Sequence, residues 1–392
     1  MKPAVVVMAH NRPQALARLL RSVAAAAHPA DVPLIISIDG GGQRETEVMR
    51  IARQFTWAYG PKEIIHHQPP LGLVAHYHFA GGLSTRYGAV IRLEDDYLVS
   101  RQYYRYAAQA LAYYADEPRL AGISLYALWF NGCTRPHLPF VPYLDEGDAF
   151  FMQLPWSQGQ AYTAGQWSVY THWRRQTKQR VTSQDPIHEI YATFPPSDWF
   201  PLKTNYLAQT NRYYLFPRES FVTNFGDVGT HFEQASRFFQ VPLQDFRRTF
   251  RFVPLDTAVA VYDAYQEMLP DRLNRLNPDL ATYDYEVDLY GTKSPAKLTA
   301  PYLLSGYPCR QPLLSFGRVM WPQEANIAAA VPGRAIHLCH RDEVDRSWPA
   351  RQQIWVAQIA YFQRGHLLSG RQRFRFWLGK TLAAFLRNRE WY

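Results

Sequence analysis

The sequence has few cysteines and no long apolar run. Its three cysteines, Cys133, Cys309 and Cys339, are widely spaced along 392 residues. This odd number indicates neither a disulfide framework nor a zinc knuckle, and a reducing compartment fits it best. No run of 18 apolar residues predicts a membrane span, and the start, MKPAVVVMAH, is too short and too weakly charged for a secretory signal. We therefore expect a cytoplasmic protein.

Glycine-rich nucleotide motifs are also missing. The sequence contains neither GxGxxG nor Walker A, so dinucleotide-dependent dehydrogenases and P-loop enzymes lose their main support. It also lacks the lysine-containing, glycine-rich loop near the start that a sugar nucleotidyltransferase would use. No internal repeat or low-complexity tract is present.

Positive charge is concentrated at the C-terminus. Residues 364–392 carry seven cations against Glu390, which accounts for most of the net charge of +9. A nucleic-acid-binding body is therefore not indicated. The same segment interleaves its cations with Phe, Trp and Leu, which predicts a basic amphipathic helix able to lie on an anionic membrane surface. The alternative is a helix docked on the body, with its arginines in water.

The remaining chain predicts an α/β protein. With 47% hydrophobic residues it can bury a large core, and its length is typical of two domains. Short apolar runs such as AVVVM, LIISID, KEIIHH and AVIRL alternate with helical stretches, which indicates a mostly parallel sheet covered by helices. We expect residues 1–240 to form this domain and residues 241–363 to form a smaller, irregular accessory module.

Polar residues follow the predicted strands. His10, Asn11 and Arg12 come after the first strand, and Asp39 ends the second, before three glycines. Because parallel sheets bind ligands beyond the carboxyl ends of their strands, these residues predict a binding site.

Three consecutive carboxylates, Glu94, Asp95 and Asp96, follow the run AVIRL. Adjacent anions at the end of a buried strand repel one another and lose hydration, so a cation or hydrogen-bond donors must meet them. One interpretation is a metal site. The other is a solvated acidic cap for the helix predicted to start near Arg101.

Five segments together resemble a known family. The segments VVVMAHNR, LIISIDGGG, VAHYHFAGGL, IRLEDDYLVS and FPRESFVTNFGDVGTHF are similar, in order and approximate spacing, to inverting GT-A glycosyltransferases. These are the enzymes related to the Golgi N-acetylglucosaminyltransferase I and to bacterial polysaccharide glycosyltransferases. The resemblance covers roughly residues 3–235 and implies a Rossmann-like sheet with helices on both faces.

The resemblance gives the acidic triplet a role. It implies a variant DxD motif in which Asp96 binds Mn²⁺ or Mg²⁺ between the phosphates of a nucleotide sugar, most simply a UDP-sugar. Asp95 and Glu94 would meet ribose or sugar hydroxyls and position Asp96.

The resemblance also brings Arg12, Asp39 and His76 to the nucleotide. Arg12 suits a phosphate or ribose edge, and Asp39 could accept the N–H of uracil. The alternatives are a surface cation beside a helix start for Arg12, a turn-stabilising carboxylate for Asp39 and a buried, hydrogen-bonded histidine for His76.

A glycine-containing loop is expected over the donor. In FVTNFGDVGTHF the resemblance implies that Thr230 and His231 touch the diphosphate, and Gly226 and Gly229 would let the loop move. A plain hairpin turn is the alternative.

An inverting transfer needs a base for the acceptor hydroxyl. The resemblance implies an Asp next to a Trp, which SDWF supplies as Asp198 and Trp199. The register departs from the family pattern, so Asp185 and Glu189 remain alternatives. The resemblance also implies that PWSQGQAY shapes the donor-sugar and acceptor pocket, where Trp156 could stack on a sugar face; the alternative is a tryptophan in the core.

The resulting hypothesis is a metal-dependent inverting glycosyltransferase. It would move a sugar from a nucleotide sugar, with UDP favoured, to a hydroxyl of a glycan or lipid-linked glycan in bacterial surface-polysaccharide synthesis. The enzyme would be cytoplasmic, at the inner membrane face if the C-terminal helix binds lipid. The alternatives are a sugar nucleotidyltransferase and a catalytically silent nucleotide- or glycan-binding module.

Overall fold

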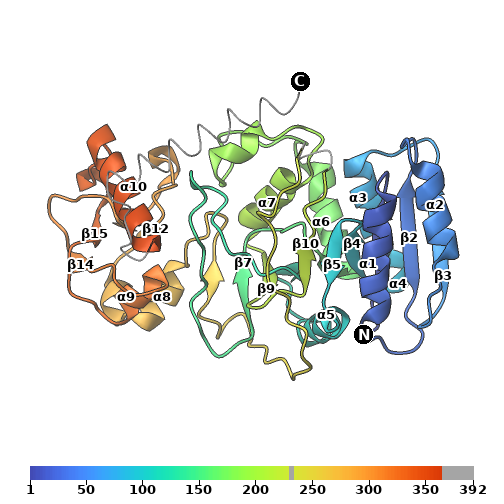
Figure 1. Ribbon diagram of the computed structural model, residues 1–392. Coiled ribbons are helices and arrows are strands. Elements are labelled where there is room, and N and C mark those ends of the chain that lie inside the picture. The colour runs from blue at the N-terminus through green and yellow to red at the C-terminus, as the bar shows by residue number, and fades with distance from the viewer. Residues whose placement is uncertain (229–233, 364–392) are drawn as a thin grey trace, which may run out of the picture.

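A nine-stranded sheet forms the centre of the protein (Figure 1). The computed structural model describes residues 1–228 and 234–363. In spatial order the strands are β11 (Val261–Tyr262), β7 (Ala149–Met152), β9 (Tyr213–Pro217), β6 (Leu120–Ser124), β8 (Gln160–Thr163), β4 (Ala89–Glu94), β1 (Ala4–Ala9), β2 (Leu34–Asp39) and β3 (Lys62–His67).

The half of the sheet that carries the predicted site is parallel. Strand β1 pairs in parallel with β2 and β4, and β2 pairs in parallel with β3. Strand β8 runs antiparallel between β4 and β6. Strands β1 and β2 are buried throughout, as expected for parallel strands covered on both faces. The predicted α/β class with a mostly parallel sheet is confirmed.

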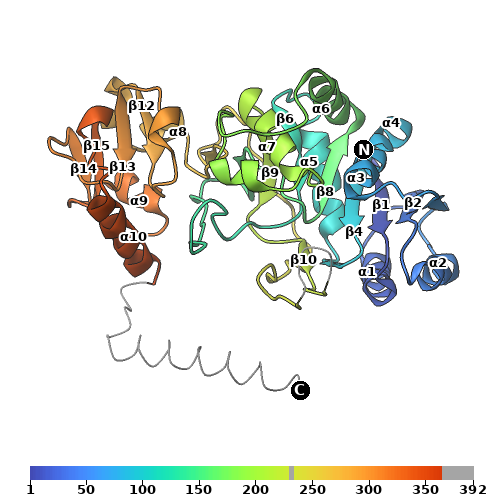
Figure 2. The same cartoon turned by 90° about the horizontal axis from the view of Figure 1, so that it is seen from above.

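Helices cover both faces of the sheet (Figure 2). One face packs against α1 (Pro13–Ala25), α2 (Glu45–Gln54) and α5 (Tyr103–Tyr113). The other face packs against α3 (Leu73–Gly82), α4 (Ser84–Tyr87), α6 (Ala164–Gln176) and α7 (Phe200–Gln209). Each face therefore has its own hydrophobic core, and the helix starts lie beside the strand ends.

A glycine lets α3 approach α6 closely. A Cβ atom added at Gly81 would lie 2.1 Å from Cζ2 of Trp167, whereas one added at Gly82 would meet nothing within 4 Å. We expect Gly81→Ala to lower the free energy of unfolding by about 1–3 kcal/mol, because the buried indole must move. Gly82→Ala should not lower it, since alanine favours the helix. Urea unfolding of both variants measures this difference, and equal effects would contradict the packing described.

A second, four-stranded sheet follows in the chain (Figure 1). Its spatial order is β12 (Tyr285–Asp288), β13 (Tyr302–Ser305), β15 (Ile336–His340) and β14 (Leu314–Phe316), and its helices are α8 (Pro270–Leu276), α9 (Gln323–Ala328) and α10 (Trp348–Phe362). This part is more regular than the sequence predicts. Strand β11 belongs to the first sheet, so the chain stays with that sheet beyond residue 240. The predicted domain boundaries themselves stay predictions.

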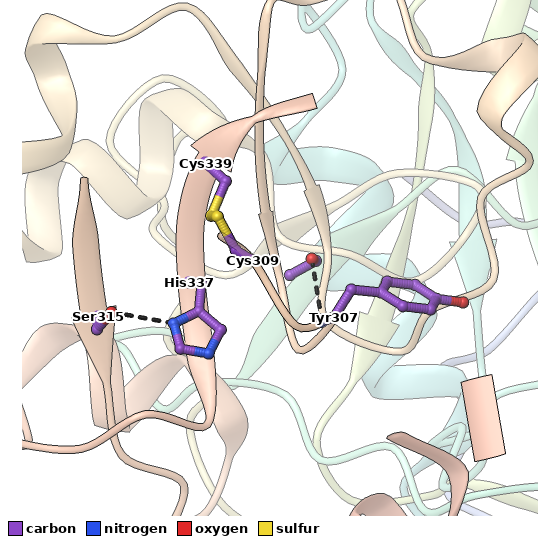
Figure 3. Close-up of a disulfide and its surroundings, with 6 residues drawn as sticks. Tyr307, Cys309, Ser315, His337 and Cys339 are labelled. Carbon is purple, nitrogen blue, oxygen red and sulfur yellow. Dashed lines mark hydrogen bonds between the residues drawn. A yellow bond between two sulfur atoms is a disulfide. The ribbon is translucent and has the colours of Figure 1, made fainter. Parts of the chain in front are cut away.

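The second sheet contains a disulfide, which corrects the prediction from cysteine spacing (Figure 3). Cys309 and Cys339 are bonded, with their Cα atoms 6.5 Å apart. The prediction failed because 30 residues separate them, and only the antiparallel pairing of β13 with β15 returns the chain to the loop that holds Cys309. Ser315 and His337 share a hydrogen bond of 3.0 Å nearby, and Cys133 remains a buried thiol.

Candidate functional site

The acidic triplet lies at the end of β4 and in the turn that leads into the next, short strand. Glu94 is the last residue of β4, and Asp95 and Asp96 form the turn into β5 (Tyr97–Val99). Strand β5 pairs antiparallel with β10 (Val222–Asn224). This pairing brings a segment more than 120 residues later in the chain against the triplet.

Asp96 has one engaged and one unengaged carboxylate oxygen. Its Oδ2 accepts hydrogen bonds of 3.0 Å from Nη1 of Arg12 and 3.0 Å from Nδ2 of Asn224. Its Oδ1 is buried and has no hydrogen-bond partner within residues 1–228 and 234–363. Burial raises the pKa of Asp96. A buried carboxylate oxygen without a donor is costly, so Oδ1 is suited to a ligand that the chain itself does not supply.

Arg12 lies between two carboxylates of the triplet. Its guanidinium forms an ion pair with Asp95 as well as with Asp96. Asp95 is only 3% exposed, and burial raises its pKa to about 7. The structure thus gives Arg12 a clear role in holding the triplet together, while its predicted contact with the nucleotide stays a prediction.

Glu94 is held by an arginine that the sequence analysis did not single out. Arg92 is fully buried in β4 and donates from Nη1 to Oε1 of Glu94 at 2.7 Å. Its Nη2 donates to the carbonyl of Ser157 at 3.0 Å, and the Tyr97 hydroxyl donates to the same carbonyl at 3.2 Å. The signal was present in the sequence, because an arginine in the apolar run AVIRL needs a buried partner.

The geometry excludes the acidic cap, and the metal site stays a prediction. Helix α5 begins at Tyr103 after the N-cap residue Gln102, so the triplet does not cap it. Carboxylate oxygens are the ligands that Mn²⁺ and Mg²⁺ prefer, and Oδ1 of Asp96 fits such an ion. No three metal-ligating side chains converge anywhere in the described part of the chain. A cation here would therefore take most of its ligands from outside the protein.

Asp39 anchors the segment before α3. Its two carboxylate oxygens accept hydrogen bonds from the backbone N–H of Leu71 at 2.6 Å and of Gly72 at 2.9 Å. The His10 ring donates from Nδ1 to the Asp39 carbonyl at 2.9 Å. The carboxyl ends of β1 and β2 and the start of α3 thus form one wall. A uracil contact for Asp39 stays a prediction.

His76 is a buried, hydrogen-bonded residue. It is 4% exposed, and its Nε2 lies 2.7 Å from the hydroxyl of Ser37, which also contacts His67 at 2.9 Å. Burial lowers the pKa of His76 to about 4. These contacts match the structural alternative for His76, and its predicted nucleotide contact stays a prediction.

Asp198 precedes α7 and is fixed by its neighbours. Its Oδ1 accepts a hydrogen bond of 2.9 Å from the backbone N–H of Phe200. The intervening Trp199 is buried and stacks on Tyr77, with ring centroids 4.0 Å apart and planes 4° from parallel. The SDWF segment therefore has a defined place over α3.

A buried cation links this segment to the triplet. The guanidinium of Arg92 binds Glu94, and its Cζ lies 5.5 Å from the ring centroid of Trp199. Of the two alternative bases, Asp185 accepts a 2.7 Å hydrogen bond from Asn205, and Glu189 is exposed on a short helical turn. Within residues 1–228 and 234–363, no ring contact of the kind made by Trp199 links either of them to Arg92.

A buried lysine lies beneath the same region and was not predicted. Lys203 is 1% exposed and donates to the Tyr77 hydroxyl at 2.7 Å. That hydroxyl donates to Oε1 of Gln160 at 3.3 Å, and Nε2 of Gln160 donates to the carbonyls of Pro155 and Trp156. The loop that carries Trp156 is therefore tied to α3 and α7 by one hydrogen-bond chain.

The loop after β10 also contacts the triplet. The Phe225 N–H donates to the Asp96 carbonyl at 3.0 Å, and Arg18 lies 3.6 Å from the Phe225 ring centroid and pairs with Asp227. The two predicted loop residues, Thr230 and His231, lie outside the described residues.

Comparisons with known proteins give only distant likeness. No protein-family model and no curated protein matches the sequence. Among solved structures, the chain is similar to S. aureus TarS (13% identity, TM-score 0.34, 57% of this chain and 36% of that chain) and to its 1–349 segment (13%, 0.35, 57% and 60%). It is also similar to the mannosyltransferase PcManGT from Pyrobaculum calidifontis in complex with GDP-Man and Mn²⁺ (12%, 0.33, 55% and 55%).

The chain thus spans between 36% and 60% of the length of these three chains. A likeness at such TM-scores does not indicate a function.

Proposed function

We propose that the protein is a metal-dependent inverting glycosyltransferase that uses a nucleotide sugar, with UDP as the nucleotide. The observation that carries this proposal is the buried Oδ1 of Asp96, which has no hydrogen-bond partner among the described residues and lies beside Arg12 and Asn224 at the carboxyl ends of parallel strands. A diphosphate with its cation is the ligand that would complete such a site.

The residues around the triplet divide the work of donor binding. Asp96 would hold the cation through Oδ1, and Arg12 would keep Asp95 and Asp96 in place as the diphosphate arrives. Glu94, fixed by Arg92, would orient sugar hydroxyls. A bound Mn²⁺ or Mg²⁺ would supply positive charge to offset the charge on departing UDP.

The proposed base of the transfer step is Asp198. The acceptor oxygen forms a bond to the anomeric carbon from the side opposite UDP, the bond from that carbon to the diphosphate breaks, and Asp198 takes the hydroxyl proton. Trp199 would fix the position of Asp198 by stacking on Tyr77. Inversion at the anomeric carbon follows from this single displacement.

The natural acceptor belongs to the same proposal. We infer a glycan or lipid-linked glycan of a bacterial surface polysaccharide, with attachment to an anionic membrane surface through residues 364–392, which lie outside the described part. Among described helices, none is long and apolar enough to cross a membrane. Cosedimentation with vesicles containing phosphatidylglycerol tests the attachment, and equal binding after truncation at Gly365 would refute it.

Turnover of donors tests the proposed activity. We expect release of UDP from at least one of a panel of UDP-sugars, dependent on Mn²⁺ or Mg²⁺, with water or a supplied glycoside as acceptor. Release of pyrophosphate from UTP and a sugar 1-phosphate would instead identify a nucleotidyltransferase. Absence of any turnover, with nucleotide binding intact, would favour the silent binding module.

A further inference from the structure

A cavity of about 500 Å³ lies beside the proposed catalytic base. Residues 71–75 at the start of α3 form one wall, and Pro196 and Ser197 form another. Ser197 directly precedes Asp198 in the chain. Residues 71 and 72 are the same ones that Asp39 holds through their N–H groups. The cavity is therefore lined by the residues that Asp39 holds and by the residue next to the proposed base.

Most of this lining is aliphatic. Leu71 and Leu73 are large apolar residues that remain 38% and 39% exposed, and Val74 and Pro196 line the cavity with them. Exposed aliphatic side chains that converge on a cavity favour an apolar ligand, because covering them removes apolar surface from water. A hydrated sugar ring alone would not cover such a wall.

One lining residue carries a full charge. Arg174, in the last turn of α6, lines the cavity together with His78. Burial, and then the nearby Arg174, lowers the pKa of His78 to about 3, so its ring is neutral at pH 7. None of the described lining residues is acidic. The cavity therefore combines an aliphatic wall with a guanidinium that no acidic residue of the described lining neutralises.

The surroundings of Arg174 add positive charge. The segment from Arg174 to Arg180 also contains Arg175 and Lys178 and no acidic residue. Arg175 shares the last turn of α6 but does not line the cavity. Any favourable effect of a cation on the C-terminal end of the helix is common to both arginines. Of the two, Arg174 alone lines the cavity.

We propose that this cavity binds the acceptor's phosphate group at Arg174 and its adjoining aliphatic chain at Leu71 and Leu73, so that the acceptor is a hydroxyl-bearing glycan joined to a lipid through phosphate. This inference rests on the proposed function, because it places the acceptor next to Asp198. An arginine fork suits phosphate oxygens, and the leucine wall accounts for the chain.

Geranyl phosphate, kept below its critical micelle concentration, is the probe. Titrated calorimetrically into the full chain with UDP and Mn²⁺ present, it should bind at least tenfold more tightly than inorganic phosphate or geraniol. Arg174→Gln should weaken binding about tenfold or more, by loss of a charge-assisted hydrogen-bonded pair. Arg175→Gln, the matched control, should leave it unchanged.

A second variant tests the aliphatic wall. Leu73→Ser, at a partly exposed position, should weaken binding of geranyl phosphate several-fold and leave binding of inorganic phosphate unchanged. Equal affinity for geranyl phosphate and inorganic phosphate would overturn the lipid part of the proposal. Equal effects of the two arginine substitutions would overturn the cavity as the site.

The test separates this inference from the proposed function. UDP with Mn²⁺ is titrated into each variant first. Normal UDP binding without binding of geranyl phosphate would overturn the cavity assignment alone. Absence of UDP binding in the unmodified chain would overturn the proposed donor site instead.

Discussion

Asp198→Asn is expected to slow UDP release from a UDP-sugar by about 100-fold to 10,000-fold, the range typical of a lost general base. The asparagine side chain keeps the size of the aspartate and can still accept the hydrogen bond from the Phe200 N–H. It cannot take the proton of the attacking hydroxyl. The measurement is a coupled assay of UDP at saturating donor and metal.

The matched controls are the two alternative bases. Glu189→Gln changes an exposed carboxylate and should leave the rate of UDP release within about twofold, as expected for a surface substitution. Asp185→Asn affects a residue that receives a hydrogen bond from Asn205, so we expect an effect on stability rather than on rate. A large loss of rate in either control, with Asp198→Asn active, would move the base to that residue.

Asp96→Asn is expected to abolish the metal-dependent part of UDP binding. The substitution retains two hydrogen-bonding atoms near Arg12 and Asn224 but removes the anionic oxygen that suits a divalent cation. We expect the Kd for UDP in Mn²⁺ to rise about 100-fold or more, which is the effect typical of losing a contact to a charged group in a buried site. Isothermal titration with and without Mn²⁺ measures it.

The control for Asp96→Asn is Glu63→Gln. Glu63 lies on β3, where it pairs with Arg86 on the surface at 2.9 Å, and its substitution should leave the UDP affinity unchanged. Circular dichroism of both variants checks that each is folded. Metal-dependent binding that survives in Asp96→Asn would show that the cation does not use this carboxylate.

The sheet and its site edge could be predicted from the sequence because the evidence for them is local. The alternation of apolar runs with helices fixes the order of β1, β2, β3 and β4, and parallel pairing then puts Arg12, Asp39 and Asp96 at one edge. The same reasoning does not decide between a ligand-binding role and a structural role for a residue at this edge. It predicts where a side chain starts, and the tertiary structure determines what it contacts.

Other contacts depend on tertiary pairing that no local pattern shows. Asn224 reaches Asp96 across 128 residues, because the three-residue strand β5 pairs with β10. The sequence leaves the role of His76 open, and only the folded chain shows that its hydrogen-bond partner is Ser37 on β2. Strands as short as β5 carry too few residues for a periodic signal, so such pairings are found only in the folded chain.

The central claim is that UDP binds at the acidic triplet together with a divalent cation. The most direct test is a calorimetric titration of UDP into the full chain, with Mn²⁺ and then with EDTA. We predict saturable binding with one UDP per chain in Mn²⁺ and about 100-fold weaker binding in EDTA, as for Asp96→Asn. Binding of equal strength in both conditions, or no binding in either, would contradict it.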